Sequence, residues 1–344
     1  MSSISRRDFL RISKFGALSL GLDLFNLDHL RPAPPASHGR IIKSGIAMFA
    51  EPKFKAKQTH VFGRDEVVQL SAEVDGDEGN PYNKVWYQVN GEGYTYSGWV
   101  QPVETVYQRP VLHLPEGGQV GEIMVPVCVS RLEPYVFARN GLRLFYGSTH
   151  WVKNVLVTNQ EKSLWYQIYD SHLKVSFYVP CHEMRLVPDD ELSPISPEIA
   201  EISKTILVDL GLQLVTAFEA DLPVFTARCS SGAKGTWTPM GEFRTYHKGP
   251  SIHMNNEGDA VDDFYDLPGV PWVTFFTSEG VAFHGTYWHN DFGRPRSHGC
   301  VNLPMHAAKF LYRWTRPFVP IGTEYLHLPG EGTRVVVMNS KLLN

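Results

Sequence analysis

The 344-residue sequence predicts a mainly β protein that is long enough for two or three domains. Its 29 glycines and 24 prolines separate short runs in which aromatic and β-branched residues alternate with polar ones. This alternation is what half-buried strands require, and turns at Gly and Pro connect such strands. One segment of this kind also occurs twice, which indicates a repeated β unit ahead of a different C-terminal part.

Composition narrows the class of protein further. Hydrophobic residues make up 43% and charged residues 20%, as in folded globular proteins. The formal net charge is −4 and no Lys/Arg cluster marks a nucleic-acid surface, so we expect no nucleic-acid partner. The four cysteines are too few for a disulfide framework, and the residues leave open whether Cys128 and Cys181 form a single bridge.

The N-terminus carries a possible targeting segment. Residues 5–11 read S-R-R-D-F-L-R, and a weakly apolar stretch and a Pro/Ala-rich run at 31–37 follow. The pattern resembles a twin-arginine export signal, which implies export to the cell envelope, either periplasm or wall. A basic arm followed by an ordinary helix is the alternative. The apolar stretch is interrupted by Asp23, and no segment reaches the roughly 18 apolar residues of a membrane span, so no permanent span is expected.

The repeated segment lies between residues 40 and 192. Residues 84–90 read K-V-W-Y-Q-V-N and residues 163–169 read S-L-W-Y-Q-I-Y, each followed by a turn and a further short strand. This pattern resembles bacterial SH3-like domains. It predicts one SH3-like module at 40–105 and a second at 106–192, with a wall glycan or peptide as the implied ligand. Two strand pairs of one larger β domain are the alternative interpretation.

The C-terminal part is predicted as a third domain at 197–330, with residues 331–344 as a tail. A polar segment with two prolines, 189–197, is the linker that precedes it. Strand patterns connected by tight turns indicate a β sheet or sandwich. The predicted elements are a hairpin at 205–219, strands at 222–228, 271–277 and 281–285, and a helix at 304–314.

Two stretches of this third domain lack a simple strand pattern. Residues 248–269 are polar, acidic and rich in Gly and Asn, which predicts a long loop and a candidate active-site lid. An ordinary surface loop is the alternative. Cys229, beside a Ser-Ser-Gly turn, is predicted to be a buried strand cysteine.

Candidate catalytic groups gather between residues 284 and 300, where His284, His289 and His298 precede Cys300. A thiol becomes a nucleophile when it ionises, and a nearby imidazole can form a thiolate–imidazolium pair with it. Such a site also needs a group that orients the imidazole. Backbone amides just before a helix, here those of Gly299 and Cys300, can form an oxyanion hole.

The motif is specific enough to indicate a family. His284-Gly285 followed by S-H-G-C-V-N at 297–302 is similar to the pattern of the L,D-transpeptidase catalytic domain, the YkuD type. Further marks of that family occur in order at 206–210, 231–232, 238–243 and 267–272, so the resemblance covers about residues 197–330. It implies a YkuD-type β-sandwich preceded by the two small SH3-like β modules.

The resemblance also implies roles for individual residues. Cys300 is the expected nucleophile, His284 the general base, and the Gly285 carbonyl the group that orients the imidazole, while His298 lines the site. The backbone amides of Gly299 and Cys300 are the expected oxyanion donors. The residues expected to hold the nucleophile loop or to bind substrate are Ser297, Asn302, Trp288, Arg296 and Tyr265.

The implied reaction forms an acyl-enzyme on a peptidoglycan stem peptide, releases D-alanine and transfers the acyl group to an amine, giving a 3–3 cross-link or wall attachment. No metal or cofactor is implied, and carbapenems are expected to acylate Cys300. Three alternatives stay open. They are a wall-peptide hydrolase of the L,D-carboxypeptidase type on the same fold, a zinc-binding module using His284, His289, His298 and Cys300, and a non-catalytic binding protein.

Overall fold

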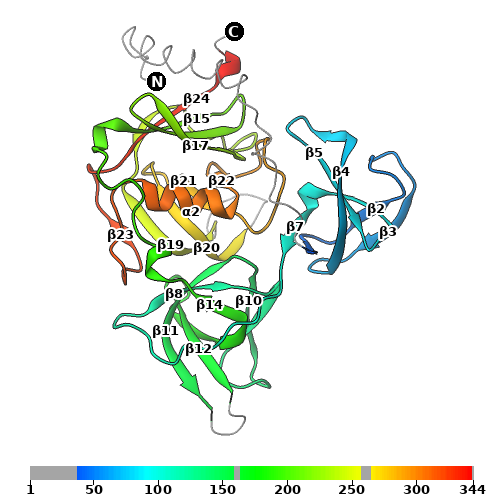
Figure 1. Ribbon diagram of the computed structural model, residues 1–344, viewed down its shortest axis with the longest axis horizontal. Helices are drawn as coiled ribbons and strands as arrows, with labels where there is room; N and C mark the ends of the chain where they lie inside the picture. The colour runs from blue at the N-terminus through cyan, green and yellow to red at the C-terminus, as the bar shows by residue number, and fades with distance from the viewer. Residues whose placement is uncertain (1–36, 159–162, 257–264, 343–344) are drawn as a thin grey trace.

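The computed structural model describes residues 37–158, 163–256 and 265–342 and shows three β units (Figure 1). The fold is mainly β, as the sequence predicts. The twin-arginine-like pattern lies outside the described residues. Among the described residues, none of the helices combines the length and hydrophobicity that a membrane-spanning segment needs.

The first two units are seven-stranded sheets in which paired strands are antiparallel. The first contains β1 (His38–Ile41), β2 (Ile46–Phe49), β3 (Gln58–Phe62), β4 (Val67–Asn80), β5 (Asn83–Val89), β6 (Gly93–Tyr96) and β7 (Val100–Val103). The second contains β8 (Gln119–Ile123), β9 (Val127–Arg131), β10 (Asn140–Phe145), β11 (Thr149–Val157), β12 (Leu164–Asp170), β13 (Val175–Pro180) and β14 (Met184–Leu186).

The two sheets are copies of one topology. Their strand orders, β3-β2-β6-β5-β4-β1-β7 and β10-β9-β13-β12-β11-β8-β14, are identical when counted from the first strand of each. Trp86 pairs with Tyr96 and Trp165 pairs with Pro180, and a 3-10 turn follows each partner directly. Each sheet also packs its own hydrophobic core, which favours two separate modules over one larger β domain. The SH3-like relationship of the modules stays a prediction.

The third unit consists of two five-stranded sheets with helix α2 (Met305–Trp314) between them (Figure 1). One sheet has the order β17 (Leu222–Arg228), β16 (Leu214–Glu219), β15 (Lys204–Asp209), β24 (Arg334–Met338), β18 (Gly241–Arg244). The other has the order β22 (Val301–Leu303), β21 (Ala282–Gly285), β20 (Asp266–Phe275), β19 (His247–Asn255), β23 (Leu326–His327). The predicted hairpin at 205–219 and helix at 304–314 are confirmed.

Two predictions about this unit are wrong in part. Residues 331–344 are not simply a tail, because β24 lies between β15 and β18 and its three valines are buried. The loop predicted at 248–269 is largely the β19–β20 hairpin. Gly, Pro and polar side chains conceal this strand pattern in the sequence. These polar groups find partners in the second module, where Thr149 donates to the Pro250 carbonyl and Asp170 pairs with His253. Residues 257–264, the centre of the predicted lid, lie outside the described residues.

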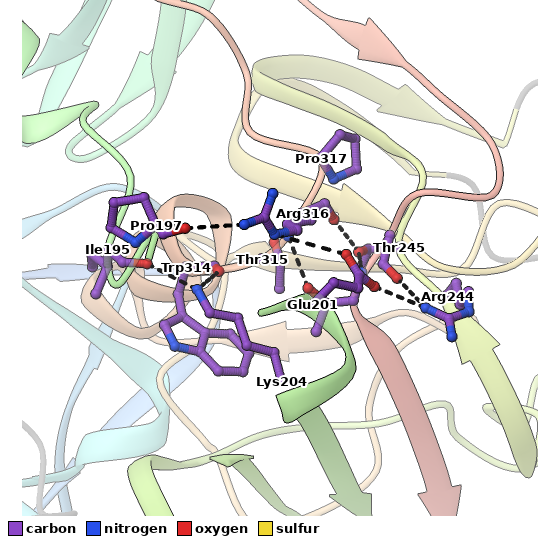
Figure 2. A network of polar contacts seen from close by, with 12 residues as sticks. Ile195, Pro197, Glu201, Lys204, Arg244, Thr245, Trp314, Thr315, Arg316 and Pro317 are labelled. Atoms are coloured by element: carbon purple, nitrogen blue, oxygen red, sulfur yellow. Dashed lines mark hydrogen bonds and ion pairs between the residues drawn. The ribbon is translucent and has the colours of Figure 1, made fainter. Parts of the chain in front are cut away.

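Two buried lysines bind the C-terminal end of α2, where helix carbonyls lack partners within the helix. Lys248 Nζ donates to the carbonyls of Tyr312, Thr315 and Pro317 at 2.5, 2.7 and 3.0 Å. Lys204 Nζ donates to the carbonyls of Trp314 and Ile195. Figure 2 shows Lys204 beside a second group of contacts, in which Glu201 pairs with Arg244 and Arg316. Two buried amino groups therefore hold the end of α2 that lies away from Cys300.

Candidate active site

The candidate base and nucleophile come from adjacent parallel strands. In the pairing of β21 with β22, His284 is opposite Asn302, and Cys300 lies just before the first residue of β22. Side chains two residues apart along extended backbone point to the same face of a sheet. The Cys300 side chain therefore lies on the same face as that of Asn302, and on the same face as that of His284. The sheet therefore brings together two residues that are separated by a long segment of chain.

The His284 ring is buried, with 2% of the residue exposed. Its Nδ1 lies 3.1 Å from the Gly285 carbonyl oxygen, which accepts a hydrogen bond from the Nδ1–H tautomer and leaves Nε2 as a proton acceptor. Burial lowers the pKa of His284 to about 4. The imidazole is neutral at neutral pH, as a general base has to be.

Cys300 is the partly exposed cysteine, whereas Cys128, Cys181 and Cys229 are buried, and all four are free thiols. Its Sγ lies 3.7 Å from the Gly280 carbonyl oxygen. Burial raises the pKa of the Cys300 thiol to about 11, and a hydrogen bond with the Ala282 backbone offsets only part of this. The resting site thus favours a neutral thiol and a neutral imidazole, so the thiolate–imidazolium pair expected from the residue types is not the favoured state.

The loop that carries Cys300 is held by the Ser-Ser-Gly turn of residues 230–232. The Ser231 carbonyl accepts hydrogen bonds from the amides of Arg296 and Ser297, and Ser230 exchanges backbone hydrogen bonds with Asn302. Thr238 Oγ1 donates to the Gly299 carbonyl at 2.7 Å and accepts from the Gly232 amide. These contacts fix both sides of Cys300.

One predicted oxyanion donor is already engaged. The Gly299 amide donates to Ser297 Oγ at 3.1 Å, and Ser297 Oγ donates in turn to the Cys300 carbonyl. Gly299 has φ +122°, a conformation that favours glycine. The Cys300 amide therefore remains the better candidate for an oxyanion hole.

Ser297 and Asn302 are buried and bind other parts of the protein, so both hold the loop, and their predicted role in substrate binding stays a prediction. Asn302 Nδ2 lies 2.9 Å from His289 Nε2, and the Asp291 amide donates to His289 Nδ1 at 3.3 Å. Both ring nitrogens of His289 are thus occupied, which argues against the zinc alternative that used this residue. Within the described ranges, no group of three or more His, Cys, Asp or Glu is placed to hold a metal ion.

The remaining predicted residues differ in their surroundings. The half-buried Trp288 packs beside the His284 ring with centroids 5.5 Å apart. Exposed His298 and half-buried Tyr265 have ring centroids 5.0 Å apart at the rim of the site. Arg296 forms an ion pair with Asp291 at 3.0 Å, so its charge already has a partner in the protein.

Sequence reasoning considered His289 only in the candidate cluster and as a possible zinc ligand, gave no role to Asp291, and cited the Ser-Ser-Gly turn and Thr238 only as family marks. The buried contacts of these residues span distant parts of the chain, and no local pattern shows that.

Comparisons with known proteins agree with the motif. Residues 203–337 match the family described as the L,D-transpeptidase catalytic domain, YkuD. Comparison with curated proteins finds no match.

Solved structures with similarity include a crystal structure of an Enterococcus faecium L,D-transpeptidase mutant, at 23% identity and TM-score 0.32 over 40% of this chain and 50% of that one. An NMR structure of the E. faecium catalytic domain has 25% identity and TM-score 0.31 over 39% and 96%. An L,D-transpeptidase from Mycobacterium smegmatis has 17% identity and TM-score 0.33 over 56% and 89%. The chain spans about half the length of the first of these.

Proposed function

We propose that residues 203–337, which match the L,D-transpeptidase catalytic domain family, carry out a transpeptidation in which a peptidoglycan stem peptide acylates Cys300 and the acyl group then passes to an amine. The observation that carries the proposal is that the partly exposed Cys300 thiol lies on the same face of the sheet as His284. The His284 ring is buried and neutral, and the Gly285 carbonyl orients it. This arrangement has a nucleophile, a base and a group that orients the base.

The chemistry follows from the neutral resting state. As Cys300 Sγ attacks the carbonyl carbon before the terminal D-alanine, its proton passes to His284 Nε2. The C–N bond then breaks, the same proton goes to the leaving amine, and a thioester and free D-alanine result. In the second half, an acceptor amine attacks the thioester and loses a proton, and the Cys300 sulfur recovers one through His284. Burial disfavours every charged intermediate of the Cys300–His284 pair, so the proton transfer to His284 and the attack of the sulfur on the carbonyl carbon occur together.

The test is turnover of purified disaccharide-tetrapeptide, followed by mass spectrometry. The full chain should release D-alanine and form a cross-linked dimer, and Cys300→Ala should do neither. Cys229→Ala is the matched control because it removes a buried thiol of the same fold. Release of D-alanine by Cys300→Ala would refute the mechanism. Formation of tripeptide without dimer would instead identify the hydrolase alternative, in which water is the acceptor.

Export and wall binding belong to the same proposal. The S-R-R-D-F-L-R run supports export to the cell envelope, where stem peptides occur. Replacing Arg6 and Arg7 by Lys in the full chain should leave the protein in the cytoplasm, as measured by fractionation, and unchanged export would refute a twin-arginine route. The two modules are proposed to bind wall glycan or peptide, and pull-down with purified wall sacculi tests this.

A further inference from the structure

The segment between the base and the nucleophile, residues 286–299, is held by the first β module. In Figure 1 the chain that follows β21 extends toward this module, which is coloured blue. Two buried polar side chains of the module reach the segment. They are Arg40 on β1 and Tyr96 at the end of β6.

Arg40 holds the start of the segment. Its guanidinium is 1% exposed and donates to the Tyr287 carbonyl at 2.6 Å, while Gln101 and Asp65 of the same module hold its other nitrogens. Tyr287 packs edge-on against Trp288, whose ring lies beside His284. Arg40 is therefore linked through two residues to the base.

Tyr96 holds the middle of the segment. Its hydroxyl lies 2.7 Å from Asp291 Oδ1 and 3.0 Å from the Asn83 carbonyl oxygen, and neither Tyr96 nor Asp291 is open to solvent. Charge-assisted hydrogen bonds of this kind are stronger than neutral ones, and buried partners cannot be replaced by water. Asp291 also pairs with Arg294 and Arg296.

From Asp291 a continuous set of contacts leads to the nucleophile. The Asp291 amide donates to His289, and His289 contacts Asn302, which pairs with His284 across the sheet and stands two residues after Cys300. Through Arg296, Asp291 is also connected to the Ser231 carbonyl beneath the nucleophile loop. Both routes end at the backbone that positions the thiol.

The first module and residues 286–299 are in close contact. A Cβ atom on Gly98 of the module would lie 2.8 Å from Asp291 Cβ. One on Gly293 of the segment would lie 2.6 Å from Tyr82 Cβ of the module. Real Cβ atoms do not approach so closely, so glycine on each side permits this contact. The Asn290 amide also donates to the Gly98 carbonyl.

We propose that the first β module is part of the catalytic centre. Tyr96 is a positioning residue, as is Arg40. They act on the backbone of Cys300 through Asp291, His289 and Asn302. This inference rests on the proposed roles of Cys300 and His284. It gives the module a function in the reaction itself, beyond any binding to the wall.

The test uses Tyr96→Phe in the full chain, which removes one hydroxyl and retains the aromatic packing. Carbapenem acylation of Cys300 is followed by intact-protein mass spectrometry. We expect the maximal rate of acylation to fall roughly tenfold with little change in the half-saturating concentration, because the loss affects positioning and not binding. Tyr94→Phe is the matched control, since Tyr94 lies on the same strand and packs inside the module.

A double-mutant cycle separates positioning from general destabilisation. If Tyr96 acts through Asn302, then Tyr96→Phe should cost little further rate once Asn302 is replaced by Ala. Additive losses, or a wild-type acylation rate in Tyr96→Phe, would overturn the inference.

Hydrogen exchange of residues 286–302 gives a readout that does not depend on activity. We expect faster exchange in Tyr96→Phe and unchanged exchange in Tyr94→Phe. If the unaltered protein is not acylated at all, the proposed function fails, and the exchange result still decides whether the module holds the segment. Equal exchange in both variants would refute that hold.

Discussion

His284 and Asn302 stand opposite each other in the parallel pairing of β21 and β22. This register fixes the position of the proposed base, His284, relative to the proposed nucleophile, because Cys300 precedes Asn302 by two residues. Asn302 is itself held by His289 and by the Ser230 backbone. The geometry of the site therefore depends on contacts that Asn302 makes within the protein.

Replacing Asn302 by Ala should both destabilise the fold and slow the reaction. The buried His289 loses its partner, which costs about 1–3 kcal/mol of unfolding free energy. Urea denaturation measures the first effect and carbapenem acylation of Cys300 the second. Asn339→Ala, at a site remote in sequence whose side chain accepts a local hydrogen bond from the Lys341 amide, should change neither. An unchanged midpoint in Asn302→Ala would show that the contact with His289 contributes nothing.

Alkylation of Cys300 should depend steeply on pH. Burial raises the pKa of its thiol to about 11, and the thiolate is the reactive form, so the rate with iodoacetamide should still rise above pH 9. The rate is measured by intact mass against glutathione, whose thiol reacts as an ordinary exposed one. A plateau near neutral pH in the free enzyme would contradict this and would indicate a thiolate–imidazolium pair.

Stability should fall in mild acid because of His284. Its pKa is lowered by burial to about 4, below the unfolded value of about 6.5, so between these values only the unfolded chain binds the proton. The contribution is fully present above pH 6.5 and is lost as pH falls toward 4, at about 1.4 kcal/mol per pH unit. Unfolding by urea at pH 7, 6 and 5 measures it. The slope should be smaller in His284→Gln than in the unaltered protein. Identical slopes in the two proteins would contradict the assignment.

Replacing Lys248 by Met should strongly destabilise the catalytic domain. Three carbonyls at the end of α2 lose their donor in a buried position, at a cost of about 2–5 kcal/mol. Lys153→Met is the control, since Lys153 forms a surface ion pair with Glu324 that is worth less than about 1 kcal/mol. Chemical denaturation of both variants measures the difference, and equal midpoints would show that the buried amino group of Lys248 contributes no more than the exposed one of Lys153.

Much of the fold follows from local patterns. Alternation and turn residues located the hairpin of β15 and β16 and the helix α2, and the two Trp-centred segments correctly indicated a repeated β unit. Strand β24 was missed because a short run of valines does not show which sheet it joins. The β19–β20 hairpin was missed because its polar residues are matched by the second module, and a sequence pattern does not contain that neighbour.

The sequence by itself determined which chemistry to expect of this protein. A Cys in S-H-G-C-V-N and an upstream His-Gly are sufficient to indicate a thiol nucleophile and its base, since reactive groups are properties of single residues. Only the tertiary structure decided the protonation of the two groups and the contacts that hold them in place. Burial makes the thiol and the imidazole neutral, and Asp291 and His289 connect the nucleophile loop to Tyr96. Desolvation and long-range hydrogen bonds depend on which segments of the chain meet. Here the hydrogen-bonded Tyr96 and Asp291 are 195 residues apart.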